Sequence, residues 1–217
     1  MVNNNILEID GSFGEGGGSI LRLGAAFSIL YDRTIRIKNI RANRPQPGLR
    51  TQHLLGLKTL ADITSSNLSK CEVGTTEITF SPKSEKFKEK FDININTAAS
   101  IGLLLQPIQI ACLKYTKPEI LSLKINGGGS FGEWAPSLNY LSKVTYPLYK
   151  RSGLDIEINV IKNGFYPKGG AKVNCFIKLP KNSLKPIILT KMGIIDLIYG
   201  EIILTSHLKK PNSDIGS

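Results

Sequence analysis

The chain has 217 residues, of which 41% are hydrophobic and 21% charged, so it is neither a peptide nor a disordered linker. Lysine and arginine outnumber aspartate and glutamate by 28 to 17, and the net charge of +11 favours contact with a polyanion. Three widely spaced cysteines without a CxxC pair argue against a disulfide framework and against a zinc site.

Two segments bear on contact with membranes. The start, MVNNNILEID, lacks the charged region and the long apolar region of a signal peptide. The most apolar stretch, residues 101–113, is shorter than the about 20 residues that a membrane span needs. We therefore expect a cytoplasmic protein that makes no membrane contact.

The first part of the chain predicts one unit of strands and helices. In chain order, periodicity predicts a strand at 6–9, a helix at 19–31, a strand at 34–40, a helix at 49–63, and strands at 71–73 and 77–80. A turn-rich segment, RANRPQPG, separates the second strand from the second helix.

The same order recurs after the charged connector SPKSEKFKEK. Here the pattern predicts a strand at 91–95, a helix at 97–113, a strand at 121–125, a helix at 136–151, and strands at 155–161 and 172–179. Pro107 and Pro147 each remove a backbone donor and are expected to kink their helices.

Two successive β-α-β-α-β-β units describe this order most simply. They predict an α+β fold in which each unit is a four-stranded mixed sheet with two helices on one face. We expect domains at residues 1–90 and 91–184, followed by a segment at 185–217.

The stretch GSFGEGGGS, residues 11–19, lies between a predicted strand and a predicted helix. Glycine there costs about 0.5 to 1 kcal/mol each, and the close approach of a ligand to the backbone is one reason to bear that cost. Glu15 would repel an anion at the helix N-terminus unless a divalent cation such as Mg²⁺ lay between them. Alternatively, Glu15 is simply an acid placed favourably near a helix N-terminus, which the spacing makes at least as plausible as a metal ligand. Arg22 could face the same junction or be a solvated helix residue.

GSFGE occurs again at residues 129–133, at the second strand-to-helix junction of its own unit. Because the first copy lies at the first junction of its unit, we interpret the identity as coincidence. Neither copy is a dinucleotide fingerprint or a phosphate loop of the GxxxxGK[ST] type, which argues against a Rossmann or P-loop enzyme.

A second dense stretch, IRANRPQPGLRTQH, covers residues 40–53. Arg41, Arg44 and Arg50 surround two prolines that stiffen the loop, and the planar guanidinium suits bidentate contact with phosphate. A solvated basic turn is the alternative.

Five stretches, taken in order, carry a family resemblance: IDGSFGEGGGSILR, IRANRPQPGLRTQHL, INTAASIGLLLQ, GGSFGEWAP and NGFYPKGGAKV. Over roughly residues 5–204 the chain resembles the RNA 3′-terminal phosphate cyclase family. The resemblance implies an enzyme that uses ATP and a divalent metal to adenylylate itself on a histidine. AMP then passes to an RNA 3′-phosphate, and the neighbouring 2′-hydroxyl displaces it to leave a 2′,3′-cyclic phosphate. RNA 3′-phosphate ends are thus the implied partner.

The resemblance also implies roles for individual residues. Glu15 falls on the position of a metal ligand of the family. The implied ATP contacts are Arg22, Gln52 and Gln106. The implied phosphate and RNA contacts are Arg41, Arg44, Arg50 and Lys168.

The family fold has three such units with a smaller domain inserted before the third, and residues 185–217 resemble the opening of that insert. We therefore expect a truncated cyclase that lacks the third unit and its nucleotidylated histidine. His53 is expected to pack in its helix, and His207 is a nucleophile candidate only by its position in TSHLKKPN, whose surroundings match the insert. Such a tail should expose apolar surface unless a second polypeptide supplies the missing unit.

Two other functions remain open from the sequence. One is a non-catalytic relative that binds RNA or assists ribosome assembly, since basic charge and phosphate loops do not require a nucleophile. The other is a small-molecule transferase of the enolpyruvyl transferase type, which would bind a phosphorylated metabolite better than RNA.

Overall fold

Strands β1 to β4 form the first of two four-stranded sheets. In the computed structural model of the protein, which describes residues 6–83, 87–132 and 134–205, their order is β1-β2-β4-β3. The strands are β1 (Leu7–Asp10), β2 (Ile35–Lys38), β3 (Asn67–Leu68) and β4 (Ile78–Ser81). Strand β1 runs parallel to β2, and the other two pairs are antiparallel.

Helices α1 (Gly18–Leu30) and α2 (Thr51–Thr64) cover one face of this sheet. The alternation of buried and exposed side chains along the strands shows which face the helices cover. Ile35 and Ile37 of β2 are buried together with Phe80 of β4, because successive side chains of a strand point to opposite faces. Arg36 and Glu77 form an ion pair on the open side.

The second sheet repeats the topology of the first, with the order β5-β6-β8-β7. Its strands are β5 (Lys90–Ser100), β6 (Ile120–Gly129), β7 (Asp155–Lys162) and β8 (Lys172–Lys178). Helix α3 (Ile101–Ala111) ends in a 3-10 turn, η1 (Cys112–Lys114). The second helical segment comprises α4 (Leu138–Tyr140), a π turn, η2 (Leu141–Thr145), and α5 (Tyr146–Ser152).

One face of the second sheet is apolar and covered. Leu123 of β6 and Cys175 of β8 are paired across the strands and fully buried. Gln109 of α3 donates through Nε2 to the Tyr146 hydroxyl oxygen of α5 at 2.6 Å, so α3 and α5 lie next to each other over this face. Burial of the Tyr146 hydroxyl raises its pKa.

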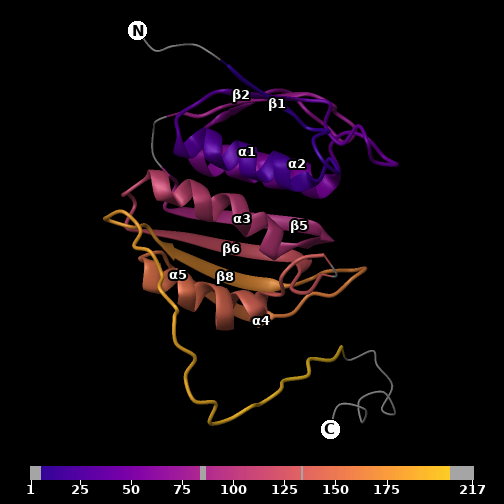
Figure 1. The fold of residues 1–217 in the computed structure, drawn as a ribbon. Coiled ribbons are helices and arrows are strands. Elements are labelled where there is room, and N and C mark those ends of the chain that lie inside the picture. The colour runs from indigo at the N-terminus through magenta and orange to yellow at the C-terminus, as the bar shows by residue number, and fades with distance from the viewer. Residues whose placement is uncertain (1–5, 84–86, 133, 206–217) are drawn as a thin grey trace. The chain divides into compact units, whose positions relative to one another are not determined.

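Helices α1 and α2 of the first sheet pack on α3 of the second, and Figure 1 shows these three helices between β1 and β6. All the strands belong to one compact unit, Met1–Lys185. The structure therefore confirms the predicted α+β fold of two four-stranded mixed sheets with helices on one face.

Three predicted elements differ in the structure. The strand expected at 71–73 is wrong, because Glu72 and Thr75 form a turn in which the Glu72 amide donates to Thr75 Oγ1 at 2.9 Å. The third helix begins at Ile101 rather than Thr97, because β5 stays extended until Ser100, whose side chain caps the helix by accepting from the Leu103 amide.

The helix expected at 136–151 is interrupted by the π turn of residues 141–145. Pro147 follows this turn near the start of α5 and has no N–H to donate to the preceding turn. The irregularity thus lies one turn before the proline, where the chain lacks the donor that a continuous helix would use.

Residues 186–205, the described part of the second unit, contain neither helix nor strand. Most of their large apolar side chains are exposed, as expected for the tail, with Met192 at 91% and Ile194 at 92%. Within the described residues, no helix has the length and apolar character that crossing a bilayer demands.

Candidate functional site

The carboxyl ends of β1 and β2 bring two loops together. Because the strands are parallel, the glycine-rich loop after β1 and the arginine-rich loop after β2 leave the same edge of the sheet. The Gly11 amide donates to the Lys38 carbonyl at 2.7 Å, and the Asn43 side-chain amide donates to the Ser12 carbonyl at 3.1 Å. These bonds fix one loop against the other.

Asp10 anchors this loop pair, a role that the sequence interpretation missed. Its Oδ1 accepts from the Ser12 amide at 3.0 Å, from the Ser12 hydroxyl at 2.7 Å and from the Asn39 side chain at 3.3 Å. The bond from the Ser12 amide is the largest cause that lowers the pKa of Asp10. An aspartate two residues before a hydroxyl in a glycine-rich turn is the signal that could have found it.

Both helices that follow these loops begin without a carboxylate. The N-cap residue is Gly17 for α1 and Arg50 for α2, and neither first turn contains an acid. The positive end of each helix dipole therefore remains for an anion, and the first amides of α1 have no side-chain cap.

Arg41 and Arg44 extend from the loop after β2. Arg41 has a left-handed backbone, φ 56°, which is uncommon for a residue with a long side chain and is found where the surrounding structure fixes it. Burial lowers the pKa of Arg41, and the charges of Arg44 and Arg50 act in the same direction. A cluster of guanidinium groups that repel one another favours an anionic ligand.

Glu15 pairs with Arg44. Arg44 Nη2 lies 2.8 Å from Glu15 Oε2, and the Glu15 side chain is otherwise 84% exposed. An exposed pair of this kind contributes little stability, so either partner can leave it at small cost.

Arg22 of α1 reaches α3. Its Nε donates to Gln106 Oε1 at 3.1 Å, and burial lowers the pKa of the guanidinium. The sequence placed both residues near ATP but had no means of placing them in contact, since they are 84 positions apart.

His53 lies beneath the N-terminus of α1. Its Nδ1 accepts from the Arg50 amide at 3.2 Å, and its Nε2 faces Gly18, where any side chain would collide with the ring. Burial lowers the pKa of His53 to about 4, and the charge of Arg41 contributes in the same direction. The imidazole is therefore neutral at pH 7, with its hydrogen on Nε2.

Several donors of this region are buried without a partner. Among the described residues, Arg41 Nε, Arg44 Nε and Gln52 Nε2 have no hydrogen-bond acceptor. Buried polar atoms are nearly always paired, so three orphaned donors around one loop pair indicate a ligand that brings acceptor oxygens. This cluster of donors and positive charges is called the loop site below.

The loop site unites most of the candidates. Loop and helix-start positions hold Glu15, Arg41, Arg44, Arg50 and Gln52, and the helices α1 and α3 supply Arg22 and Gln106. Lys168 lies elsewhere, on the connection between β7 and β8 of the second sheet. His207 lies outside the described residues.

The loop site offers one carboxylate to a cation. No group of three histidine, cysteine, aspartate or glutamate side chains that could hold a metal occurs in the described part of the chain. Magnesium often binds through one or two carboxylates and completes its shell with phosphate oxygens and water. Glu15, exposed and held only by Arg44, fits that kind of site.

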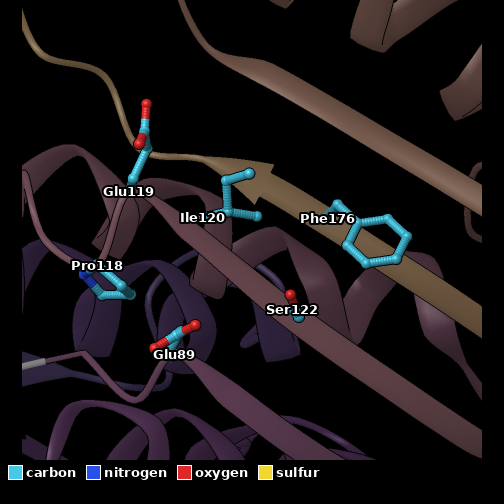
Figure 2. A pocket seen from close by; sticks show the side chains of 6 residues that line it. All are labelled: Glu89, Pro118, Glu119, Ile120, Ser122 and Phe176. Atoms are coloured by element: carbon cyan, nitrogen blue, oxygen red, sulfur yellow. The ribbon is translucent and has the colours of Figure 1, made fainter.

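A hollow on the open face of the second sheet is a separate feature, and its two carboxylates make it unsuitable for an anion. Figure 2 shows its lining at the start of β6, with Phe176 of β8 beside Ser122 and the carboxylates of Glu89 and Glu119 at its border. Glu119 pairs with Lys181 at 3.3 Å. Since β6 ends in the glycine-rich loop, this hollow lies at the other end of the strand.

Comparison with known proteins gives a consistent result. A family model described as RNA 3′-terminal phosphate cyclase matches residues 13–213. A protein of that name from Methanopyrus kandleri is 39% identical over 196 residues, which make up 90% of this chain and 54% of the relative. Another from Methanosarcina barkeri is 45% identical over 173 residues, 80% of this chain and 51% of the relative. The chain spans about half the length of these curated relatives.

Proposed function

The chain belongs to the RNA 3′-terminal phosphate cyclase family, and on this basis we propose that it contributes the phosphate- and nucleotide-binding loops of an ATP-dependent cyclase. In the proposed reaction ATP adenylylates the protein with release of pyrophosphate, and AMP then passes to an RNA 3′-phosphate. The neighbouring 2′-hydroxyl then displaces AMP and leaves a 2′,3′-cyclic phosphate. The activity is proposed for the whole protein, since this chain spans about half the length of its relatives.

The orphaned donors of the loop site are the observation that supports this proposal most. Arg41 and Arg44 direct unpaired Nε–H groups into a region that already holds several positive charges. Phosphate oxygens would accept from these donors, and the charge-assisted bonds would be strong because the site is partly desolvated. Arg50 at the start of α2 adds to the same charge.

Two glutamines and one arginine are assigned to the nucleotide. Gln106 orients Arg22 by accepting from its Nε, which leaves the other guanidinium nitrogens of Arg22 to donate to a ligand. Gln52 in the first turn of α2 has a buried Nε2 free to donate. Lys168, on the second sheet, is assigned to the RNA backbone.

Glu15 is the residue assigned to the metal. A bound magnesium ion would neutralise the charge of the phosphate oxygens and polarise them. In its absence Glu15 is held by Arg44, so the pair keeps the carboxylate from repelling an incoming phosphate.

His53 does not act as the nucleophile in this proposal. Its Nδ1 lone pair accepts from the Arg50 amide, and its Nε2 is enclosed against Gly18. A ring with one nitrogen engaged and the other carrying the hydrogen has no lone pair to attack a phosphate. Its place is structural, between the starts of α1 and α2.

The test is a change of Arg44, with a matched pair as its control. Arg44→Ala should weaken binding of ATP with Mg²⁺ by about tenfold to 100-fold, because a charge-assisted bond is lost and Glu15 is left unpaired. Arg36→Ala breaks an ion pair of the same type with Glu77 on the open face of the first sheet. Equilibrium binding should show that variant within about twofold of the wild type. Equal affinities of the Arg44 variant and the wild type would overturn the assignment.

A non-catalytic RNA-binding relative is the second candidate, because the guanidinium cluster of Arg41, Arg44 and Arg50 could bind RNA phosphates without a nucleophile. Incubation with ATP labelled at the α-phosphate separates the two. An acid-labile phosphoramidate adduct would support the enzyme. RNA binding that falls steeply with salt, without any adduct, would support the second candidate. Family membership favours RNA over the phosphorylated metabolites of an enolpyruvyl transferase.

A further inference from the structure

Two loops of the second sheet are joined into one rigid feature. The loop after β6 and the connection between β7 and β8 exchange two hydrogen bonds. The Ser130 amide donates to the Gly164 carbonyl at 2.9 Å, and the Gly164 amide donates to Ser130 Oγ at 2.9 Å. Beside these bonds, the rings of Phe131 and Phe165 stack with centroids 5.3 Å apart and planes at 8°.

Two further aromatic side chains of these loops are largely exposed to solvent. Trp134 is 88% exposed and Tyr166 is 87% exposed, the one on the loop after β6 and the other on the β7–β8 connection. Leaving such large rings in water forgoes the free energy that burial would give. Exposed aromatic groups on a rigid support are therefore better explained by a ligand than by the fold.

The charge of the same connection indicates the kind of ligand. The sequence from Ile161 to Lys172 contains three lysines and no acid. Lys162 and Lys168 are both exposed. Aromatic rings that stack on bases, flanked by lysines that contact the backbone, are the usual means by which proteins bind single-stranded nucleic acid.

We propose that Trp134 and Tyr166 form a stacking platform for unpaired bases of a single-stranded RNA, with Lys168 contacting its phosphate backbone. The inference rests on the proposed function, since it names how the RNA substrate would be held apart from the loop site. Stacking tolerates any base, so the platform selects unpaired RNA without selecting its sequence. A duplex, whose bases are already stacked, would gain nothing from it.

Trp134 is the only tryptophan of the chain, so its fluorescence reports directly on the platform. A single-stranded RNA of about ten nucleotides with a 3′-phosphate should quench the emission of the wild-type chain on titration. A duplex of the same sequence should quench it weakly. In a separate binding assay with labelled RNA, Trp134→Ala and Tyr166→Ala should each lower the affinity about fivefold to 100-fold.

Tyr31→Ala is the matched control, because Tyr31 is 70% exposed and lies at the C-cap of α1, a helix of the first sheet rather than of the second. It should leave the RNA affinity unchanged. Far-UV circular dichroism of each variant checks that the fold is kept. An RNA whose bases are removed but whose phosphates remain should bind the wild type and the Trp134 variant equally.

The possible failures can be told apart. RNA that binds the wild type without quenching Trp134, and binds the two platform variants as well as the wild type, overturns the platform and leaves the proposed function standing. RNA that does not bind the wild type at all overturns both the platform and the RNA substrate. ATP binding to the loop site, measured separately, then decides whether the nucleotide part of the proposed function survives.

Discussion

At the scale of the residue, His53 is a neutral imidazole beside the guanidinium groups of Arg41, Arg22 and Arg50. His53 is 9% exposed, and burial is the largest cause of its low pKa of about 4. A protonated ring would add a further positive charge next to Arg41 and would lose its acceptor role toward the Arg50 amide. The folded state therefore opposes protonation of His53.

This opposition makes the stability depend on pH. Between pH 6.5 and about 4 the unfolded chain binds a proton at His53 that the folded chain does not, so the free energy of unfolding rises with pH. The contribution is complete above pH 6.5 and is lost as the pH falls toward 4. Allowing for solvent screening, it amounts to about 2 kcal/mol.

His53→Asn tests this dependence, because the asparagine oxygen can still accept from the Arg50 amide. Urea unfolding at pH 7 and at pH 4.5 should show a smaller loss of stability in the variant than in the wild type. Other titrating groups are common to both proteins and cancel in the difference. An identical pH dependence of the two proteins would contradict the low pKa.

At the scale of the element, the arginine-rich loop is held by a close contact between two turns. Gly48 has φ 78°, and a side chain there would overlap the Gly74 carbonyl. The Gly74 amide in turn donates to the Leu49 carbonyl at 2.8 Å. This contact fixes the point where the loop enters α2, and with it the placement of Arg50.

Gly48→Ala and Gly74→Ala separate crowding from backbone strain. Both glycines have a positive φ, but only the first has no room for a methyl group. Gly74→Ala should lower the free energy of unfolding by about 1 kcal/mol. Gly48→Ala should lower it by at least about 2 kcal/mol more, because the backbone must move. Equal losses in urea unfolding would show that the contact between the turns does not constrain the loop.

At the scale of the whole molecule, the chain consists of a folded unit and a tail without regular structure. Lys185 ends the folded unit, where its amide donates to the Ser152 carbonyl at 2.8 Å and its carbonyl accepts from Ser152 Oγ at 2.7 Å. Residues 186–205 have no ladder or helix to protect their peptide bonds.

Limited proteolysis with trypsin should therefore cut first after Lys191 and leave a fragment that contains both sheets. Arg151 gives the internal comparison, because it too is exposed but belongs to α5. Cleavage after Arg151 should follow only after the tail is lost, since a helix must open locally before a protease can bind it. Simultaneous cleavage at both sites, seen by mass spectrometry, would contradict the division into two units.

The spacing of apolar residues, every second position in strands and every third or fourth in helices, predicted most of the architecture, because it reflects which side of each element is buried. The alternation in TIRIKNI predicted β2, and the repeated order of elements predicted two sheets of the same topology. The prediction failed where a specific hydrogen bond or strand pairing overrides propensity. Glu72 and Thr75 close a turn where apolar neighbours suggested a strand, and β5 continues to Ser100 because it is still paired with Gly129.

The sequence by itself determined the family and the type of fold and supplied the residues that we propose meet a phosphate, because motifs and periodicity are properties of neighbouring residues. Only the tertiary structure decided which of those residues meet. It placed Arg22 against Gln106, engaged Nδ1 of His53 with the Arg50 amide, and left the Nε donors of Arg41 and Arg44 unpaired. The physical reason is that burial and hydrogen bonding between distant segments arise from packing of the whole chain, which no local pattern encodes.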